Sequence, residues 1–201
     1  MKFKFKTLSC LVLALSGLYH AQSQALVKGA DVSWLTQMEK AGKSFYNDSG
    51  SKQDLFPILK AHGMNAIRLR VWVNPSDGWS NITDVVAKAK RAKAAGFDIM
   101  IDFHYSDWWA DPGKQNIPAA WKNMTYPQMK KALAAHTIAM LTLLKRNGID
   151  VRWVQVGNET THGFLWPVGR AETNMKQYAG LTEAGYKAVK SVYPKAICIV
   201  H

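Results

Sequence analysis

The sequence predicts an α/β fold built on a parallel sheet, and specifically the first part of a (β/α)8, or TIM, barrel. Five short apolar runs that are typical of strands alternate with four longer helical patterns, an order that produces right-handed βαβ units. The segments after the strands are long and aromatic, whereas those after the helices are short and marked by glycine. This asymmetry is typical of a barrel whose functional face lies at the carboxyl ends of its strands.

The length of the chain limits how much of a barrel it can form. A complete eight-unit barrel takes about 250 residues, whereas this chain has 201. We therefore expect a partial barrel domain over residues 26–201, truncated after its fifth strand. A doubly wound sheet is the alternative architecture, but no glycine-rich phosphate loop follows any expected strand.

The expected strands are short, apolar and rich in β-branched residues. In chain order they are Leu26–Ser33, Asn65–Val73, Phe97–Phe103, the run from Val151 that breaks at Gly157, and Lys195–Val200.

The expected helices follow from periodic apolar residues and, in the first three, from a glycine just past the end. They span Gln53–Ala61, Asp84–Ala95, Gln128–Asn147 and Thr173–Val192, and Thr83 is expected to cap the second. Two aromatic loops, His104–Pro127 and Thr160–Arg170, follow the third and fourth strands. Because long loops inside a compact domain are usually functional, these two loops are candidate parts of a site.

The first 25 residues have the pattern of a signal peptide. A basic start, MKFKFK, precedes the apolar run Leu8–Leu18, which is too short to span a bilayer, and small residues suit cleavage near Ala25. We therefore expect a secreted or periplasmic protein with no stable membrane anchor. Cys198 is the single cysteine after the signal, so no disulfide framework is expected.

The formal net charge is +12, and several basic residues fall on the outer faces of expected helices. No pattern of basic and aromatic residues typical of a nucleic-acid module is present. A solvated basic surface is the favoured interpretation, and we expect no nucleic-acid partner.

Glu159 is the most informative residue of the chain. It follows Asn158 at the end of the fourth expected strand, where α/β barrels place their chemistry. On position alone, a surface acid in a loop is an equally good interpretation.

Polar residues inside the other strands favour a built site. Because side chains alternate along a strand, four pairs share a face near the carboxyl ends of neighbouring strands. These pairs are Asp31 with Ser33, Arg68 with Arg70, Asp102 with His104, and Gln155 with Glu159. Buried charges are costly unless they are paired, so one such pair could be a chance structural contact, but four in register indicate a site.

The residue types restrict the chemistry. The sequence has no HExxH helix, no zinc-type Cys/His spacing and no GxSxG motif, and Asp102 with His104 is a weak metal set. Carboxylates in a cleft lined by arginine and aromatic residues suit glycoside hydrolysis, in which one acid protonates the leaving oxygen and a second attacks or activates water. Tryptophan faces can stack on sugar rings, although packing in the core is the common alternative for any one tryptophan.

The chain resembles glycoside hydrolase family 53, the arabinogalactan endo-β-1,4-galactanases. The matching segments are KGADVSWL, DLFPILKAHGMNAIRLRVW, DIMIDFHYSDWWADPGKQ with the following PAAW, and WVQVGNETTHGFLWP. The resemblance covers nearly all of residues 27–201. It implies a catalytic domain that cleaves internal β-1,4-galactosidic bonds of type I arabinogalactan or pectic galactan with retention, needs no cofactor, and is a monomer at full length.

The resemblance also implies site residues. Glu159 matches the proton donor, Asn158 the residue that holds the sugar 2-OH, and Arg68 the arginine that supports the nucleophile. Further residues match or border the sugar-binding positions: Asp31, Trp34, Arg70, His104, Tyr105, Ser106, Asp107, Trp108 and His201.

The chain departs from the family pattern in one respect. The family nucleophile is a second glutamate at the end of strand seven, and this sequence reaches only strand five. Asp102 is the nearest substitute, and its surroundings indicate a structural role. We therefore expect the chain to be inactive alone. The resemblance also implies that the calcium site of some bacterial relatives belongs to loops in the C-terminal part of the barrel. The alternatives are a non-catalytic carbohydrate-binding remnant of the barrel and a plain α/β structural domain.

Overall fold

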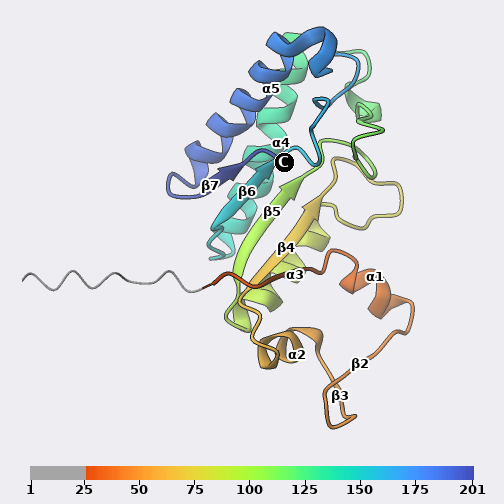
Figure 1. Ribbon diagram of the computed structural model, residues 1–201, viewed down its shortest axis with the longest axis vertical. Coiled ribbons are helices and arrows are strands. Elements are labelled where there is room, and N and C mark those ends of the chain that lie inside the picture. Colours follow the sequence, from red (N-terminus) through yellow and green to blue (C-terminus); the bar gives the residue numbers. More distant parts are fainter. Residues whose placement is uncertain (1–25) are drawn as a thin grey trace, which may run out of the picture.

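The computed structural model describes residues 26–201, so the expected signal peptide lies outside the described residues. The main sheet has five parallel strands in the order β1-β4-β5-β6-β7. Their bounds are Gly29–Asp31, Ala66–Val71, Asp98–Phe103, Trp153–Val156 and Ile197–Ile199. Each expected strand is therefore present, shorter than its apolar run, and adjacent in space to its neighbours in sequence (Figure 1).

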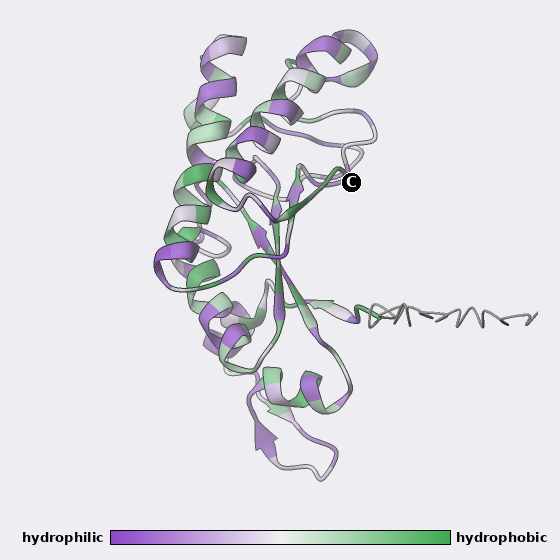
Figure 2. Cartoon of the chain, turned by 90° about the vertical axis from the view of Figure 1, so that its left-hand side faces the viewer, coloured by the Kyte–Doolittle hydropathy of each residue, from purple (hydrophilic) through white to green (hydrophobic). Residues whose placement is uncertain are grey.

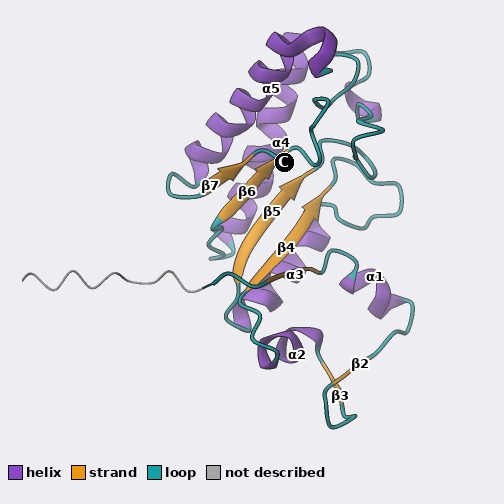
Figure 3. Cartoon of the chain, viewed as in Figure 1, coloured by secondary structure: helices purple, strands orange, loops and turns teal. Residues whose placement is uncertain are grey.

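The long helices cover one face of this sheet. They are α3 (Ile82–Ala94), α4 (Tyr126–Arg146) and α5 (Ala171–Val192), and Figures 2 and 3 show them to one side of the strands. Fully buried strand residues such as Leu69, Ile101 and Val154 form the core with apolar residues of these helices. The alternation of β-strand and α-helix, with helices on the outside, is that of the first part of a barrel.

Helix starts differ in detail from the predictions. Helix α3 begins at Ile82 because the side chain of Asn81, not Thr83, accepts the hydrogen bond from the backbone N–H of Asp84, so the predicted cap was wrong. Helix α2 (Leu55–Ala61) begins two residues later than expected, with Asp54 as its N-cap. Helix α4 includes Pro127 in its first turn, where a missing N–H is harmless.

The segment between β1 and α2 contains structure that the sequence pattern did not predict. A short helix, α1 (Leu35–Lys40), follows β1, and a small hairpin joins β2 (Phe45–Tyr46) to β3 (Lys52–Gln53). The loop after β5 also contains a 3-10 turn, η1 (Ala119–Trp121). Helix α1 matters for the site because it lies directly after the carboxyl end of β1.

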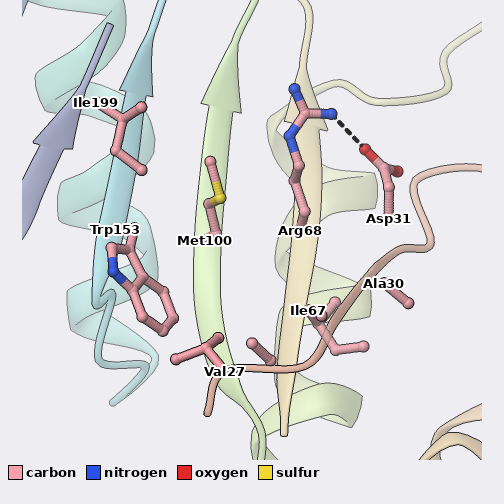
Figure 4. Close-up of a pocket in the computed structure, with 10 residues that line it drawn as sticks. Val27, Ala30, Asp31, Ile67, Arg68, Met100, Trp153 and Ile199 are labelled. Atoms are coloured by element: carbon pink, nitrogen blue, oxygen red, sulfur yellow. Dashed lines mark hydrogen bonds and ion pairs between the residues drawn. The ribbon is translucent and has the colours of Figure 1, made fainter. Parts of the chain in front are cut away.

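The inner face of the sheet carries polar residues toward its carboxyl edge. In the strand register, Asp31 lies beside Arg68, and Arg70, Asp102 and Gln155 lie side by side on β4, β5 and β6. The lower part of the same face is an apolar hollow lined by Val27, Ala30, Met100, Trp153 and Ile199 (Figure 4). The predicted alignment of polar residues across four strands is confirmed.

Candidate active site at the carboxyl edge of the sheet

Arg68 is the centre of a network that joins the ends of four strands. Its guanidinium donates to Asp31 Oδ2 at 2.6 Å, to Asn158 Oδ1 at 2.9 Å and to Gln155 Oε1 at 3.2 Å. A second carboxylate oxygen, Asp102 Oδ2, lies 2.8 Å from the same side chain. Figure 4 shows the Arg68–Asp31 pair above the apolar hollow. One cation thus fixes the spacing of groups at the ends of four strands, of which Asn158 is 90 residues from Arg68 in sequence.

Asp102 is held on two sides and is fully buried. Arg68 contacts it on one side, and His104 Nε2 lies 2.9 Å from the same oxygen, Asp102 Oδ2. Both nitrogens lie within ion-pair distance of Asp102, although neither contact has the geometry of a hydrogen bond. His104 Nδ1 accepts the backbone N–H of Ala110 at 3.1 Å, which leaves Nε2 as the ring nitrogen that carries a proton next to Asp102. This geometry makes Asp102 a support for Arg68 and His104.

Hydrogen bonds also determine the charge of Asp31. Burial alone would raise the pKa of this carboxyl, but hydrogen bonds from Ser33 and Arg68 outweigh the effect of burial and hold the pKa below its ordinary value. Asp31 is therefore an ionised partner of Arg68 at neutral pH.

Asn158 is buried and fixed through both ends of its amide. Its Nδ2 donates to the carbonyl of Ala110 at 2.8 Å, and its Oδ1 accepts from Arg68 and from Gln155 Nε2 at 3.0 Å. Gln115 Nε2 donates to the carbonyls of Asn158 and Glu159 at 2.8 and 3.2 Å. The Gln115 side chain, in the loop after β5, thereby fixes the backbone that leaves β6.

Glu159 lies at a sharp turn of this fixed backbone. Its φ is +50°, a left-handed conformation that costs a non-glycine residue about 1–3 kcal/mol and concentrates at functional sites. Gly157 makes the turn possible, because its φ is +88° and a Cβ there would lie 2.5 Å from Thr160 Cγ2. The half-buried Glu159 carboxyl forms no hydrogen bond or ion pair with any residue in 26–201. The structural alternative, an ion pair of Glu159 with Arg68, is therefore absent from the described chain.

His201 joins the network at its open edge. Its Nδ1 lies 3.3 Å from Gln155 Nε2 and 3.4 Å from Asn158 Oδ1, and its carbonyl accepts the hydroxyl of Thr160 at 2.8 Å. The segment after β7 thus lies beside the carboxyl end of β6 and the residues that follow it, as expected from the parallel order.

In the loop after β5, Trp108 is open to solvent, whereas Ser106 and Asp107 form hydrogen bonds within or next to the loop. Trp108 is half exposed, as is Trp34 after β1. Ser106 is buried and its hydroxyl donates to the carbonyl of Trp108. Asp107 accepts backbone N–H groups of Asn74 at 3.0 Å and Ala119 at 2.8 Å. Ser106 and Asp107 therefore shape the loop with their polar atoms.

Tyr105 lies on the other side of the sheet from the network. Its side chain is fully buried, stacks on Phe103 and Phe164 at centroid distances of 5.4 and 5.6 Å, and bonds to Thr137 of α4 at 2.9 Å. The ring shares the core face of the sheet with Phe103, as alternation along β5 predicts, although the φ of Tyr105 is +52°. This position corrects the expectation that Tyr105 lines the sugar-binding positions.

Several site residues were missed as such by the sequence analysis. Gln155 was recognised only as a polar strand residue, and Gln115, Trp72 and Trp109 were not assigned. Their signal was present: Gln155 is a polar residue inside an apolar strand, and the other three lie in or beside the aromatic segments.

Within residues 26–201, no group of three or more Asp, Glu, His or Cys side chains could hold a metal ion. In the same range, no helix combines the length and apolar character needed to cross a membrane.

An ionic network at the carboxyl edge of a parallel sheet, next to exposed tryptophan rings, places this chain in the class of (β/α)8 glycoside hydrolase domains. The sequence model of glycosyl hydrolase family 53 matches residues 27–201. The chain belongs to this family.

Curated relatives agree with this membership. An endo-beta-1,4-galactanase of Bacillus subtilis (strain 168) is 38% identical over 183 residues, which are 87% of this chain and 42% of that protein. The arabinogalactan endo-beta-1,4-galactanase of Thermothelomyces thermophilus is 42% identical over 176 residues, 87% of this chain and 52% of that protein. The chain spans about half the length of the curated relatives it matches.

A solved structure extends the agreement to the fold. The Ignisphaera aggregans GH53 catalytic domain superposes with a TM-score of 0.83 at 39% identity, covering 87% of this chain and 51% of that domain. The five-stranded sheet is therefore part of a (β/α)8 barrel.

Proposed function

We propose that this chain is the part of an endo-acting, retaining β-1,4-galactanase that supplies the proton donor, Glu159. Its substrate would be type I arabinogalactan or pectic galactan. The observation that carries the proposal is the arrangement around β6. Asn158 is locked by Arg68 and Ala110, whereas the next residue, Glu159, has a carboxyl with no partner in the described chain. A carboxyl that protonates a leaving oxygen must be left available to the substrate in this way.

The second carboxylate of the mechanism is proposed to lie outside this sequence. A retaining enzyme needs a nucleophile about 5 Å from the acid. Asp31 and Asp102 are both engaged by Arg68, and Asp102 is fully buried. Neither is therefore free to attack a sugar, which supports the proposal that residues 26–201 do not turn over galactan alone.

The residues around Glu159 have supporting roles in this proposal. Asn158 would hold the sugar 2-OH, and Arg68 would orient the nucleophile. Asp31, Trp34, Arg70, His104, Trp108 and His201 would border the substrate or support the residues that do so. Tyr105 is omitted because its ring lies in the core.

The setting of the protein is also a proposal. The pattern of residues 1–25 supports export to the periplasm or the medium, where a plant polysaccharide would be met. We propose a monomer at full length, with a polysaccharide substrate and no nucleic-acid partner.

The proposal is tested in a chimaera that joins residues 26–201 to the second half of the Ignisphaera aggregans barrel. Cleavage of β-1,4-galactan is measured as released reducing ends. The chimaera should be active, and Glu159→Ala should lower kcat on galactan by about 10²–10⁴, the contribution of a general acid. On a dinitrophenyl galactobioside kcat/KM should fall much less, because that leaving group needs no protonation. The kcat should still fall, because Glu159 also activates the water that hydrolyses the glycosyl-enzyme.

Glu183→Ala is the matched control, since this acid lies exposed on α5 in a pair with Lys187. Its activity should equal that of the parent chimaera. Equal rates of the Glu159→Ala and parent chimaeras on galactan would refute the role of Glu159. Galactan binding by a chimaera that never cleaves would favour the alternative of a carbohydrate-binding remnant.

A further inference from the structure

Lys88 is a fully buried lysine on the face of α3 that packs against the sheet. Its side chain is 0% exposed, and the buried residues that share this face include Val85, Ala89 and Ala92. An apolar side chain would suit this position, whereas a buried ammonium is costly unless it is paired and hydrogen-bonded. Within residues 26–201, none of its hydrogen bonds goes to Arg68, so direct contact with the centre of the site does not explain its burial.

The ammonium of Lys88 joins α3 to the segment that follows β1. Its Nζ donates to the backbone carbonyl of Ser33 at 2.6 Å and to Asp84 Oδ2 at 2.5 Å. Burial lowers the pKa of Lys88, and the hydrogen bond to Asp84 opposes that effect. The Asp84 carboxylate, 8% exposed, also accepts the hydroxyl of Thr36 at 2.5 Å and the backbone N–H of Ser80 at 2.7 Å. The buried pair therefore ties both α1 and the loop before α3 to one point.

Ser33 connects the buried pair to the Arg68 network. Its backbone N–H donates to Asp31 Oδ1 at 2.9 Å, and its hydroxyl accepts the backbone N–H of Arg70 at 2.8 Å. The other oxygen of the same carboxylate, Asp31 Oδ2, accepts from Arg68 at 2.6 Å (Figure 4). Each hydrogen bond on the path from Lys88 to Arg68 is therefore 2.9 Å or shorter.

We propose that Lys88 is a positioning residue, which fixes Asp31 and through it Arg68 for the reaction. Strand β1 has three residues and ends at Asp31, so Ser33 lies beyond the strand pairing that would otherwise hold its backbone. A buried ion pair contributes little net stability compared with apolar residues, and its better-attested use is to fix one arrangement of the chain. This inference rests on the proposed galactanase function, in which Arg68 orients the nucleophile.

The test variant is Lys88→Met/Asp84→Asn, which removes both charges so that neither is left buried without its partner. Asparagine keeps the shape of Asp84 and can still bond to the groups that Asp84 holds, whereas methionine cannot donate to the Ser33 carbonyl. Lys187→Met/Glu183→Gln is the matched control, because this pair has the same i,i+4 spacing, lies 2.6 Å apart on α5 and is exposed.

A second variant, Lys88→Gln/Asp84→Asn, keeps a donor that can reach toward the Ser33 carbonyl. Its effects should have the same direction as those of the methionine variant and be smaller. It therefore decides the question if the methionine variant does not fold.

The first readout is the pKa of Asp31, measured in the chain itself by carbon-13 NMR of the side-chain carboxyl. Burial alone would raise this pKa, but hydrogen bonds from Ser33 and Arg68 hold it below its ordinary value. The pKa should shift upward in the Lys88 variants, because Ser33 is no longer held against the carboxylate. One positive and one negative charge are removed together, so the shift reports the lost position of Ser33. The control should leave the pKa unchanged.

The second readout is kcat/KM in the chimaera. It should fall by about 10–100-fold on galactan in Lys88→Met/Asp84→Asn, a typical effect of misplacing a positioned group. The loss should be equal on the dinitrophenyl galactobioside, because Arg68 serves formation of the glycosyl-enzyme with either leaving group. A loss of folded enzyme alone would lower kcat, leave KM unchanged and leave the pKa of Asp31 in the folded molecules as it is in the parent.

The outcomes separate this inference from the proposed function. An unchanged Asp31 pKa in both Lys88 variants would overturn the positioning role, whatever the chimaera does. A raised Asp31 pKa with parental kcat/KM on both substrates would also overturn it, because Asp31 would then move without consequence for the reaction. A parent chimaera that does not cleave galactan would overturn the proposed function and with it the role of Lys88 in the reaction, while the Asp31 titration would still show whether Lys88 holds this carboxylate.

Discussion

Replacing Asp102 with asparagine should destabilise the chain by about 3 kcal/mol, because it removes the buried partner of Arg68. Breaking a buried ion pair costs about 3–5 kcal/mol. The lower end applies here, since Arg68 keeps Asp31 at 2.6 Å and its side chain is 26% exposed, so water compensates part of the lost contact. Asparagine also keeps one oxygen beside the arginine.

Asp98→Asn is a matched control on the same strand. Asp98 pairs with Arg152 at 2.5 Å, but both side chains are 40% exposed or more, and such pairs contribute at most about 1 kcal/mol. Urea unfolding followed by tryptophan fluorescence measures both variants, with an unchanged m-value required for the comparison. A loss below 1 kcal/mol for Asp102→Asn, equal to that of the control, would refute the role assigned to this buried carboxylate.

Three further predictions concern the fold. Burial among aromatic rings lowers the pKa of His136 to about 4. As the pH falls, the histidine of the unfolded chain, with a pKa near 6.5, takes up its proton first, so the free energy of unfolding should fall by about 2 kcal/mol between pH 7 and about pH 5. His136→Phe should reduce this pH dependence, measured by urea unfolding at each pH. Gly185→Ala should lower the midpoint of thermal unfolding, because the new Cβ would lie 2.5 Å from Val156 Cγ1, a clash worth about 1–3 kcal/mol. A raised midpoint would refute this prediction and show that β6 moves away to accommodate the methyl group. Asn81→Ala should lower the free energy of unfolding in urea by about 1 kcal/mol, whereas Thr83→Ala should leave it almost unchanged. A larger loss for Thr83→Ala than for Asn81→Ala would show that Thr83 is the N-cap.

The main sheet could be predicted because its strands are apolar and their polar residues alternate. Ile67, Leu69 and Val71 alternate with Arg68 and Arg70, so the sequence alone assigns one set to the core and the other to the site. The order of strands follows from the βαβ pattern, which fixes that neighbours in sequence are neighbours in the sheet. The convergence of Asp31, Arg68 and Asp102 follows from these two facts.

Other elements could not be predicted, for physical reasons that differ. Helix α1 has six residues and the strands of the hairpin two each, too few to show a periodic pattern. Tyr105 was assigned to the sugar-binding positions through the resemblance, whereas alternation along β5 places it on the core face with Phe103, where its ring lies. The contacts of Arg70 with Trp72 and Trp109 join strand β4 to the loop after β5, and no local sequence pattern encodes such contacts.

The most direct test of the central claim is the release of reducing ends from β-1,4-galactan by residues 26–201, measured alone and after addition of a separately produced second half of the Ignisphaera aggregans barrel. The account predicts no cleavage by either half, cleavage by the mixture, and none when the chain carries Glu159→Gln. Cleavage by the chain alone at the rate of the mixture would contradict the claim that Glu159 needs a carboxylate from beyond His201.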